Sequence, residues 1–219
     1  MKNWMLLWVL FGLFVQSACT SDTTGSSQQQ AQQQADTTSA PKPSAEKRQI
    51  VAGKNVGPIE ASFSEADIIQ AVGADNVVRK EYGIGEGETA PASIVFPDSP
   101  KELVVFWKPD QLYQSIDYIR IEQPEASWRT SQDIGIGTTL EQLIILNGKE
   151  FNFYGFDWDY AGLAKDWNGG FIHKKLEVFL VAENPEAVYP HLLGDKLSSS
   201  SNLKARAADL VVDVMVIRF

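Results

Sequence analysis

Cysteine, histidine and positive charge are all scarce in this chain of 219 residues. The single cysteine, Cys19, excludes an internal disulfide framework and a zinc site built from several thiolates. Two histidines, His173 and His191, leave little material for a metal centre or a catalytic triad. The 19 lysines and arginines face 28 aspartates and glutamates, and the resulting net charge of −9 argues against a nucleic-acid partner.

Catalytic and cofactor-binding motifs are also missing: there is no Gly-x-Ser-x-Gly elbow, no phosphate-binding loop and no His-Glu-x-x-His. Residues 83–87 stop short of a dinucleotide-binding fingerprint because Glu88 stands at the third glycine position, so we interpret them as a hairpin loop. Residues 157–168 begin like a calcium loop, but Ala161 and Asn168 stand where ligands belong. We therefore predict neither a cofactor nor a bound metal ion.

The one long apolar run, residues 4–15, follows Lys2 and precedes small residues. This arrangement is typical of a secretory signal peptide, here residues 1–18. The run is shorter than the about 20 apolar residues of a membrane-spanning helix.

Ser17, Ala18 and Cys19 resemble the lipobox of bacterial lipoproteins, although Gln16 stands where leucine or valine is usual. The resemblance implies that Cys19 carries the lipid and becomes the mature N-terminus in the cell envelope. The alternative is an ordinary signal peptide with an incidental cysteine. Thr20, rather than aspartate, follows the cysteine, which favours the outer membrane and leaves the leaflet open.

Residues 19–49 are predicted to be the lipidated cysteine and a disordered tether. From residue 20 to residue 47 there is no aromatic side chain, and serine, threonine and glutamine dominate. Loss of Lys2 with the signal peptide changes the net charge from −9 to −10. An anionic bilayer surface repels such a body, so membrane attachment is expected to depend on the lipid alone.

Residues 50–219 are predicted to form one globular domain of two repeats, about 56–125 and 128–219, the second with an insertion at about 184–209. Aligning Gly73 with Gly148 places Ser64 on Thr139. Serine and threonine are good helix N-caps, and glycine suits the residue after a helix. Each repeat should therefore open with a short helix.

Downstream, Leu103 aligns with Leu176, and Asp117 aligns with Asp213. Runs rich in β-branched and aromatic residues predict strands at 77–82, 102–107 and 117–121, and at 151–160, 175–180 and 213–217. The fold class is therefore α+β, a duplicated helix–strand–strand–strand unit with helices packed on one side of antiparallel strands. Two small sheets and one continuous sheet both remain open.

The run from Thr138 to Leu143, leading to Gly148 and strands, resembles the SmpA/OmlA small lipoproteins and the repeats of β-lactamase-inhibitory-protein-like domains. The resemblance implies a noncatalytic binding or assembly role at the cell envelope. Inhibition of a β-lactamase does not follow from it, because no residue matches an inhibitory loop.

An aromatic segment offers candidate binding residues. Alternation places Phe156, Trp158 and Tyr160 on one face of the predicted strand, while Phe151 and Phe153 have the opposite parity. A bulge at Gly155 would turn Phe156 and Trp158 inward with the earlier phenylalanines, into the core. Without it, Trp158 and Tyr160, together with Trp167, would form an exposed patch for a partner.

The favoured hypothesis is a membrane-anchored, noncatalytic module that binds an envelope protein. An alternative is a glycan or small-ligand binder that uses the aromatic residues near Trp158. A third hypothesis is a hydrolase that uses the paired carboxylates Asp157 and Asp159.

Metabolic labelling with a fatty acid tests the anchor. The wild-type protein should incorporate the label, and Cys19→Ala should lose it because the thiol is the acylated group. Label that persists in Cys19→Ala would contradict lipidation at this residue.

Overall fold

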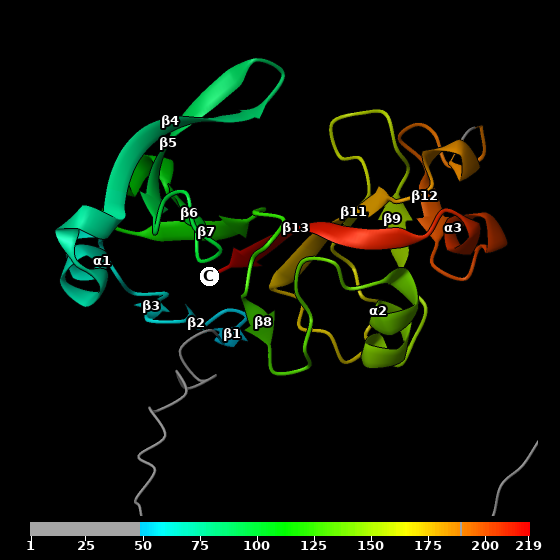
Figure 1. Ribbon diagram of the computed structural model, residues 1–219, viewed down its shortest axis with the longest axis horizontal. Helices are drawn as coiled ribbons and strands as arrows, with labels where there is room; N and C mark the ends of the chain where they lie inside the picture. Colours follow the sequence, from blue (N-terminus) through cyan, green and yellow to red (C-terminus); the bar gives the residue numbers. More distant parts are fainter. Residues whose placement is uncertain (1–48, 189) are drawn as a thin grey trace, which may run out of the picture. The chain divides into compact units, whose positions relative to one another are not determined.

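The computed structural model describes residues 49–188 and 190–219 (Figure 1). The predicted signal peptide 1–18, Cys19 and the tether up to residue 48 lie outside the described residues. Gln49 already belongs to a strand, one residue before the predicted start of the globular domain. No helix in the described part of the chain is long and apolar enough to cross a membrane.

Three α-helices and thirteen strands form within these residues. The helices are α1 (Glu65–Val72), α2 (Leu140–Asn147) and α3 (Leu203–Ala207). The strands of the first half are β1 (Gln49–Val51), β2 (Asn55–Val56), β3 (Ile59–Glu60), β4 (Val77–Gly85), β5 (Glu88–Val95), β6 (Leu103–Trp107) and β7 (Ile116–Ile121). The remaining strands are β8 (Arg129–Thr130), β9 (Asn152–Tyr154), β10 (Leu163–Ala164), β11 (Leu176–Ala182), β12 (Leu197–Ser199) and β13 (Leu210–Arg218).

Seven strands form one antiparallel sheet in the order β10-β11-β13-β7-β6-β5-β4. A smaller sheet has the order β3-β2-β1-β8, and β9 pairs with β12. The predicted α+β class with antiparallel strands is confirmed. The two halves share one continuous sheet rather than forming two separate ones.

Both long helices begin where their caps predict. The Ser64 side chain accepts a hydrogen bond from the Asp67 backbone, and the Asp67 carboxylate accepts one from the Ser64 backbone at 2.9 Å. Thr139 and Gln142 make the same reciprocal pair at the start of α2. These capping boxes satisfy backbone N–H groups that a helix start leaves free, so each repeat begins its helix at the equivalent residue.

The strand registers match the predicted alignment of the repeats. Val105 lies opposite Ile119 in the β6–β7 pair, and Val178 lies opposite Met215 in the β11–β13 pair. The alignment makes Val105 equivalent to Val178 and Ile119 equivalent to Met215. The strand pair that it predicts to be duplicated is therefore duplicated in the sheet.

The two copies meet at the pairing of β7 with β13. Ile119 lies opposite Ile217, and Ile121 lies opposite Met215. Since Ile119 is equivalent to Met215 and Ile121 is equivalent to Ile217, replacing each residue of the first pair by its equivalent gives the second pair. Arg120 and Val216 are themselves equivalent and lie opposite each other. An approximate two-fold axis, perpendicular to the sheet, therefore passes between them.

All three helices and the small sheet pack against one face of the seven-stranded sheet. Ile68 of α1, Leu143 of α2 and Ile59 of β3 are fully buried in the same core as Ile119 and Met215. The opposite face carries a smaller cluster of buried residues, Ala92, Ile94, Val104 and Phe106. We call this second side the open face, because no helix of the described residues contributes to its cluster.

Several elements differ from the predicted unit. Four sheet strands, not three, follow α1, because residues 88–95 form β5 despite Pro91. In the second half, the strand predicted at 151–160 is only β9 and ends at Tyr154. The predicted insertion contains the short helix α3.

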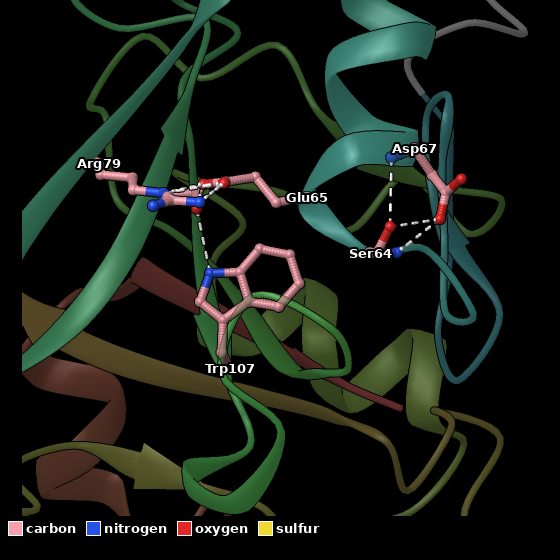
Figure 2. A network of polar contacts seen from close by, with 6 residues as sticks. Ser64, Glu65, Asp67, Arg79 and Trp107 are labelled. Atoms are coloured by element: carbon pink, nitrogen blue, oxygen red, sulfur yellow. Dashed lines mark hydrogen bonds and ion pairs between the residues drawn. The ribbon is translucent and has the colours of Figure 1, made fainter.

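A buried carboxylate ties α1 to the sheet (Figure 2). Glu65, only 5% exposed, accepts hydrogen bonds from Arg79 Nε at 2.8 Å and from Ser93 Oγ at 2.6 Å. Ser93 Oγ in turn accepts the indole N–H of Trp107 at 3.0 Å. The Arg79 guanidinium also lies over the Tyr113 ring, 3.9 Å from its centroid. The network therefore joins the first turn of α1 to β4, β5 and β6.

The surroundings of Glu65 favour its ionised form. Burial alone raises the pKa of Glu65, but hydrogen bonds from Arg79 and Ser93 and the positive charge of Arg79 outweigh it and lower the pKa. The stability that the ionised group contributes is therefore fully present above its ordinary pKa of 4.5. It is lost as the pH falls through the lower folded-state value.

Replacing Glu65 with glutamine should expose this dependence. At neutral pH, Glu65→Gln is expected to lower the free energy of unfolding by about 1–3 kcal/mol, because the buried acceptor loses its charge. In acid the difference from wild type should shrink, since the wild-type carboxylate is then protonated too. Urea unfolding across pH measures both effects, with Glu60→Gln at the exposed residue of β3 as the control. A difference independent of pH would contradict the role given to the ionised carboxylate.

Separation of the two halves should abolish folding of the first. A fragment ending at Pro124 retains β7 but lacks β13, so the central strand loses one of its partners and part of its cover. We expect the fragment 49–124 to be unfolded or insoluble, while 49–219 melts in one cooperative transition by circular dichroism. A sharp melt of the shorter fragment would mean that the halves are autonomous.

Candidate binding groove on the open face

A groove of about 520 Å³ lies on the open face of the sheet. In Figure 1, the β4–β5 hairpin and the segment between β9 and β10 rise on the same side of the sheet, away from β1, β2 and β8. Both of these segments contribute lining residues. The open-face groove is lined by Gly83, Ile84, Gly85, Tyr118, Arg120, Asp159, Tyr160, Leu163, Lys165, Glu177, Phe179, Val216 and Arg218.

Strand alternation places the groove's floor residues. In β7, Ile119 and Ile121 enter the main core, so Tyr118 and Arg120 face the other way. The same alternation in β11 sends Phe179 to the open face. The floor is therefore held by the buried residues of its own strands.

Arg120 lies at the approximate two-fold axis and is partly withdrawn from water. Its Nε donates to Glu122 at 2.6 Å, and its guanidinium carbon lies 5.7 Å from the centroid of the Phe179 ring. Burial lowers the pKa of Arg120, and this effect exceeds the opposite effect of the charges of Tyr118 and Asp213, which raise the pKa. The arginine remains a cation, but one with less hydration than a surface side chain.

Arg218 has a parallel arrangement one strand away. Its Nε donates to Glu177 at 2.8 Å, and its guanidinium carbon lies 5.1 Å from the centroid of the Tyr118 ring. The hydrogen bond to Glu177 raises the pKa of Arg218. Each groove arginine is thus held by one carboxylate and one aromatic ring.

Aromatic stacking holds the tyrosine that lies under Arg218. Phe106 stacks on Tyr118 with 4.6 Å between ring centroids, and Tyr82 meets Phe106 edge-on at 5.7 Å. Burial raises the pKa of Tyr118, and burial together with Asp213 raises the pKa of Glu122. The row of rings crosses from β4 to β7 and fixes the Tyr118 side chain against the floor.

One wall of the groove is the tip of the β4–β5 hairpin. Gly85, Glu86 and Gly87 all have positive φ, at 110°, 50° and 79°, which confirms the predicted hairpin loop. Ile84 is 50% exposed at this tip. The wall therefore offers backbone and one apolar side chain.

The other wall includes Tyr160, one of the aromatic residues predicted from the sequence, and Trp158 packs against it outside the groove lining. Trp158 is half-buried, and its indole N–H donates to the Gly155 carbonyl at 2.9 Å. Tyr160 packs against Trp158, with 5.2 Å between ring centroids, and is 53% exposed where it lines the groove. Tyr154 meets Trp158 edge-on, with 5.3 Å between ring centroids, and is tilted against Tyr160 at 6.3 Å.

Trp167 does not belong to the exposed patch predicted for it. Its side chain is 3% exposed, it packs against Phe151, and its indole N–H donates to the Leu176 carbonyl at 2.7 Å. Its polar atom is therefore used inside the core, and it cannot contact a partner without unfolding.

Of the two alternatives for the aromatic segment, the one that needs a bulge at Gly155 is not realised in the strand. Strand β9 ends at Tyr154, and the Gly155 backbone packs so closely on residues 192–194 that an added Cβ would lie 2.4 Å from the Gly194 carbonyl oxygen. The chain then leaves the strand instead of slipping by one residue within it. Phe156 consequently packs at the edge of the core, while Tyr160 is exposed.

The remaining sequence candidates lie on exposed loops. Asp157 and Asp159 are both exposed after β9, and of these two only Asp159 lines the groove. His191 is exposed, and His173 accepts a hydrogen bond from the Lys175 backbone at 3.1 Å. The structure brings neither histidine to the groove lining.

The residues of the groove floor are not predicted from the sequence. Tyr118 and Arg120 alternate with isoleucines, and on a strand this pattern looks the same as an ordinary solvated face. The available signal was the repeat alignment, which makes Phe179 equivalent to Phe106 and places an aromatic residue on the same face of both halves.

Comparison with known proteins finds no matching family model, no similar curated protein and no similar solved structure. The function must therefore be inferred from the groove and the sequence.

Proposed function

We propose that this chain is a lipid-anchored, noncatalytic protein-binding or assembly module of the bacterial cell envelope, and that its partner binds in the open-face groove. The observation that carries the proposal is the pair of arginines, Arg120 and Arg218, each held against an aromatic ring within one groove.

The composition of the groove supports a protein partner. Tyrosine, phenylalanine and arginine are enriched in the cores of protein interfaces, and arginine and tyrosine are frequent hot spots. Here Tyr118, Phe179 and both arginines lie side by side on three neighbouring strands. Because packing and ion pairs already restrict these side chains, binding costs them little conformational entropy.

The exposed ring of Tyr160 extends this surface beyond the sheet. It offers a partner an apolar face with a hydroxyl group at its edge. The same ring would serve a glycan, whereas the indole N–H of Trp158 is already bonded to Gly155. A protein partner would contact both the Tyr160 ring and the arginines of the groove floor. The presence of both kinds of group favours a protein partner over a glycan.

The envelope location rests on the sequence before the globular domain. Cys19 follows a predicted signal peptide and precedes a segment without aromatic residues. A lipid at Cys19 would hold the protein on a membrane, and the intervening residues would let the domain reach a partner.

Site-specific photocrosslinking tests the groove as the binding surface. A photoreactive amino acid replaces Tyr160 or Ile84 in the full-length protein, and replaces Leu203, 80% exposed on α3, as the control. After irradiation in cells, we expect one discrete protein adduct from the two groove positions and none of the same mass from Leu203.

Equal adducts from all three positions would indicate nonspecific contact and would contradict the proposal. A carbohydrate adduct at Tyr160 would favour the glycan alternative.

A further inference from the structure

We infer that the open-face groove selects a partner segment that presents carboxylate side chains next to apolar ones. This inference rests on the proposed function and specifies the chemistry of its partner. It begins with the spacing of the two groove arginines.

Arg120 and Arg218 are diagonal neighbours across the central strand pair. Arg120 lies opposite Val216, and Arg218 lies opposite Tyr118, two residues back along β7. Diagonal neighbours of this kind in antiparallel sheets are about 7 Å apart. Two guanidinium groups on one face are therefore close enough to contact one short segment.

Each arginine uses only some of its N–H groups in hydrogen bonds to other residues of the chain. The hydrogen bonds of Arg120 and Arg218 to Glu122 and Glu177 both come from Nε. Among the described residues, no hydrogen bond uses the two terminal nitrogens of either guanidinium. Terminal guanidinium nitrogens bind a carboxylate through two parallel hydrogen bonds, so both groove arginines retain this capacity.

Burial increases the free energy that Arg120 gains from binding a carboxylate. Arg120 has a side chain only 31% exposed, and burial lowers its pKa, so it gains more from a new charge-assisted bond than a fully hydrated arginine does. Lys165 adds a third cation at the rim, against the carboxylates of Asp159 and Glu177. With Glu122, which pairs with Arg120, the site holds three cations and three carboxylates, so it lacks the excess of negative charge that gives the whole chain its net charge of −9.

The apolar lining favours an acidic protein segment over a polyanion. Phe179, Val216 and Leu163 lie among the charged residues, and Ile84 stands at the rim. A segment that alternates acidic and apolar side chains would use both kinds of surface. A nucleic acid or a highly charged glycan would leave the apolar lining unused, and the acidic body of the protein would repel it.

The first experiment repeats the Tyr160 photocrosslinking with the floor altered. Arg120→Gln/Arg218→Gln in the full-length protein should reduce the protein adduct at least tenfold, because each lost arginine removes a charge-assisted, two-bond contact. The matched control, Lys174→Gln/Arg206→Gln, removes two exposed cations outside the groove lining and should change the adduct less than twofold.

A single substitution guards against loss of folding. Arg120→Lys keeps the charge but lacks the planar fork, so it should also reduce the adduct while keeping the melting temperature close to that of wild type.

The second experiment identifies the partner group. A carbodiimide joins an amine to a carboxylate as an amide, so Lys165 should couple to an aspartate or glutamate of the partner, as read by mass spectrometry. Lys174 serves as the control amine.

The outcomes separate this inference from the proposed function. If the groove adduct persists in both arginine variants, or if Lys165 couples to a uronate sugar, the carboxylate inference is overturned. A persisting adduct would leave the groove as a protein-binding surface. If no groove position gives an adduct in the wild-type protein, the proposed function itself fails.

Discussion

The pairing of β7 with β13 is the interaction on which the rest of the structure depends. It joins two halves of the chain that are far apart in sequence, and it places Ile119 against Ile217 and Ile121 against Met215 in the core. A four-stranded meander with one helix leaves much of its sheet uncovered and a strand edge unpaired. The central pair removes that edge from both halves at once.

The symmetry of this pair also explains why one face of the sheet stays open. A rotation about an axis perpendicular to a sheet does not interchange the two faces of the sheet. Equivalent elements of the two halves must therefore cover the same face. Helices α1 and α2 are such elements, and both pack into the one main core. The open face is therefore a consequence of the duplication, and the groove floor forms where the two copies meet.

Most of the regular structure was predictable because local chemistry specifies it. The capping residues Ser64 and Thr139 fixed the helix starts, and runs of β-branched residues fixed β6, β7, β11 and β13. Strand β5 escaped prediction because Pro91 and its alanine neighbours have low strand propensity, and neighbouring strands overrode it. The positions of Trp158 and Tyr160 depend on contacts of the Gly155 region with residues almost forty positions later, which no local pattern records. The burial of Trp167 depends on its packing against Phe151 and on its hydrogen bond to the Leu176 carbonyl.

The groove itself arises where the two halves depart from symmetry. Phe106 and its equivalent Phe179 occupy the same face, but Tyr82 and Tyr118 flank Phe106, whereas Phe179 lines the groove beside Arg120. The repeat alignment also makes Val104 equivalent to Glu177, so only the second half carries the carboxylate that holds Arg218. The first half of the open face thus contributes a closed apolar cluster together with Arg120 and the hairpin wall, and the second half contributes Arg218, Lys165 and the carboxylates of Asp159 and Glu177. Duplication accounts for the continuous sheet on which the groove lies, and divergence between the copies accounts for the charged side chains that line it.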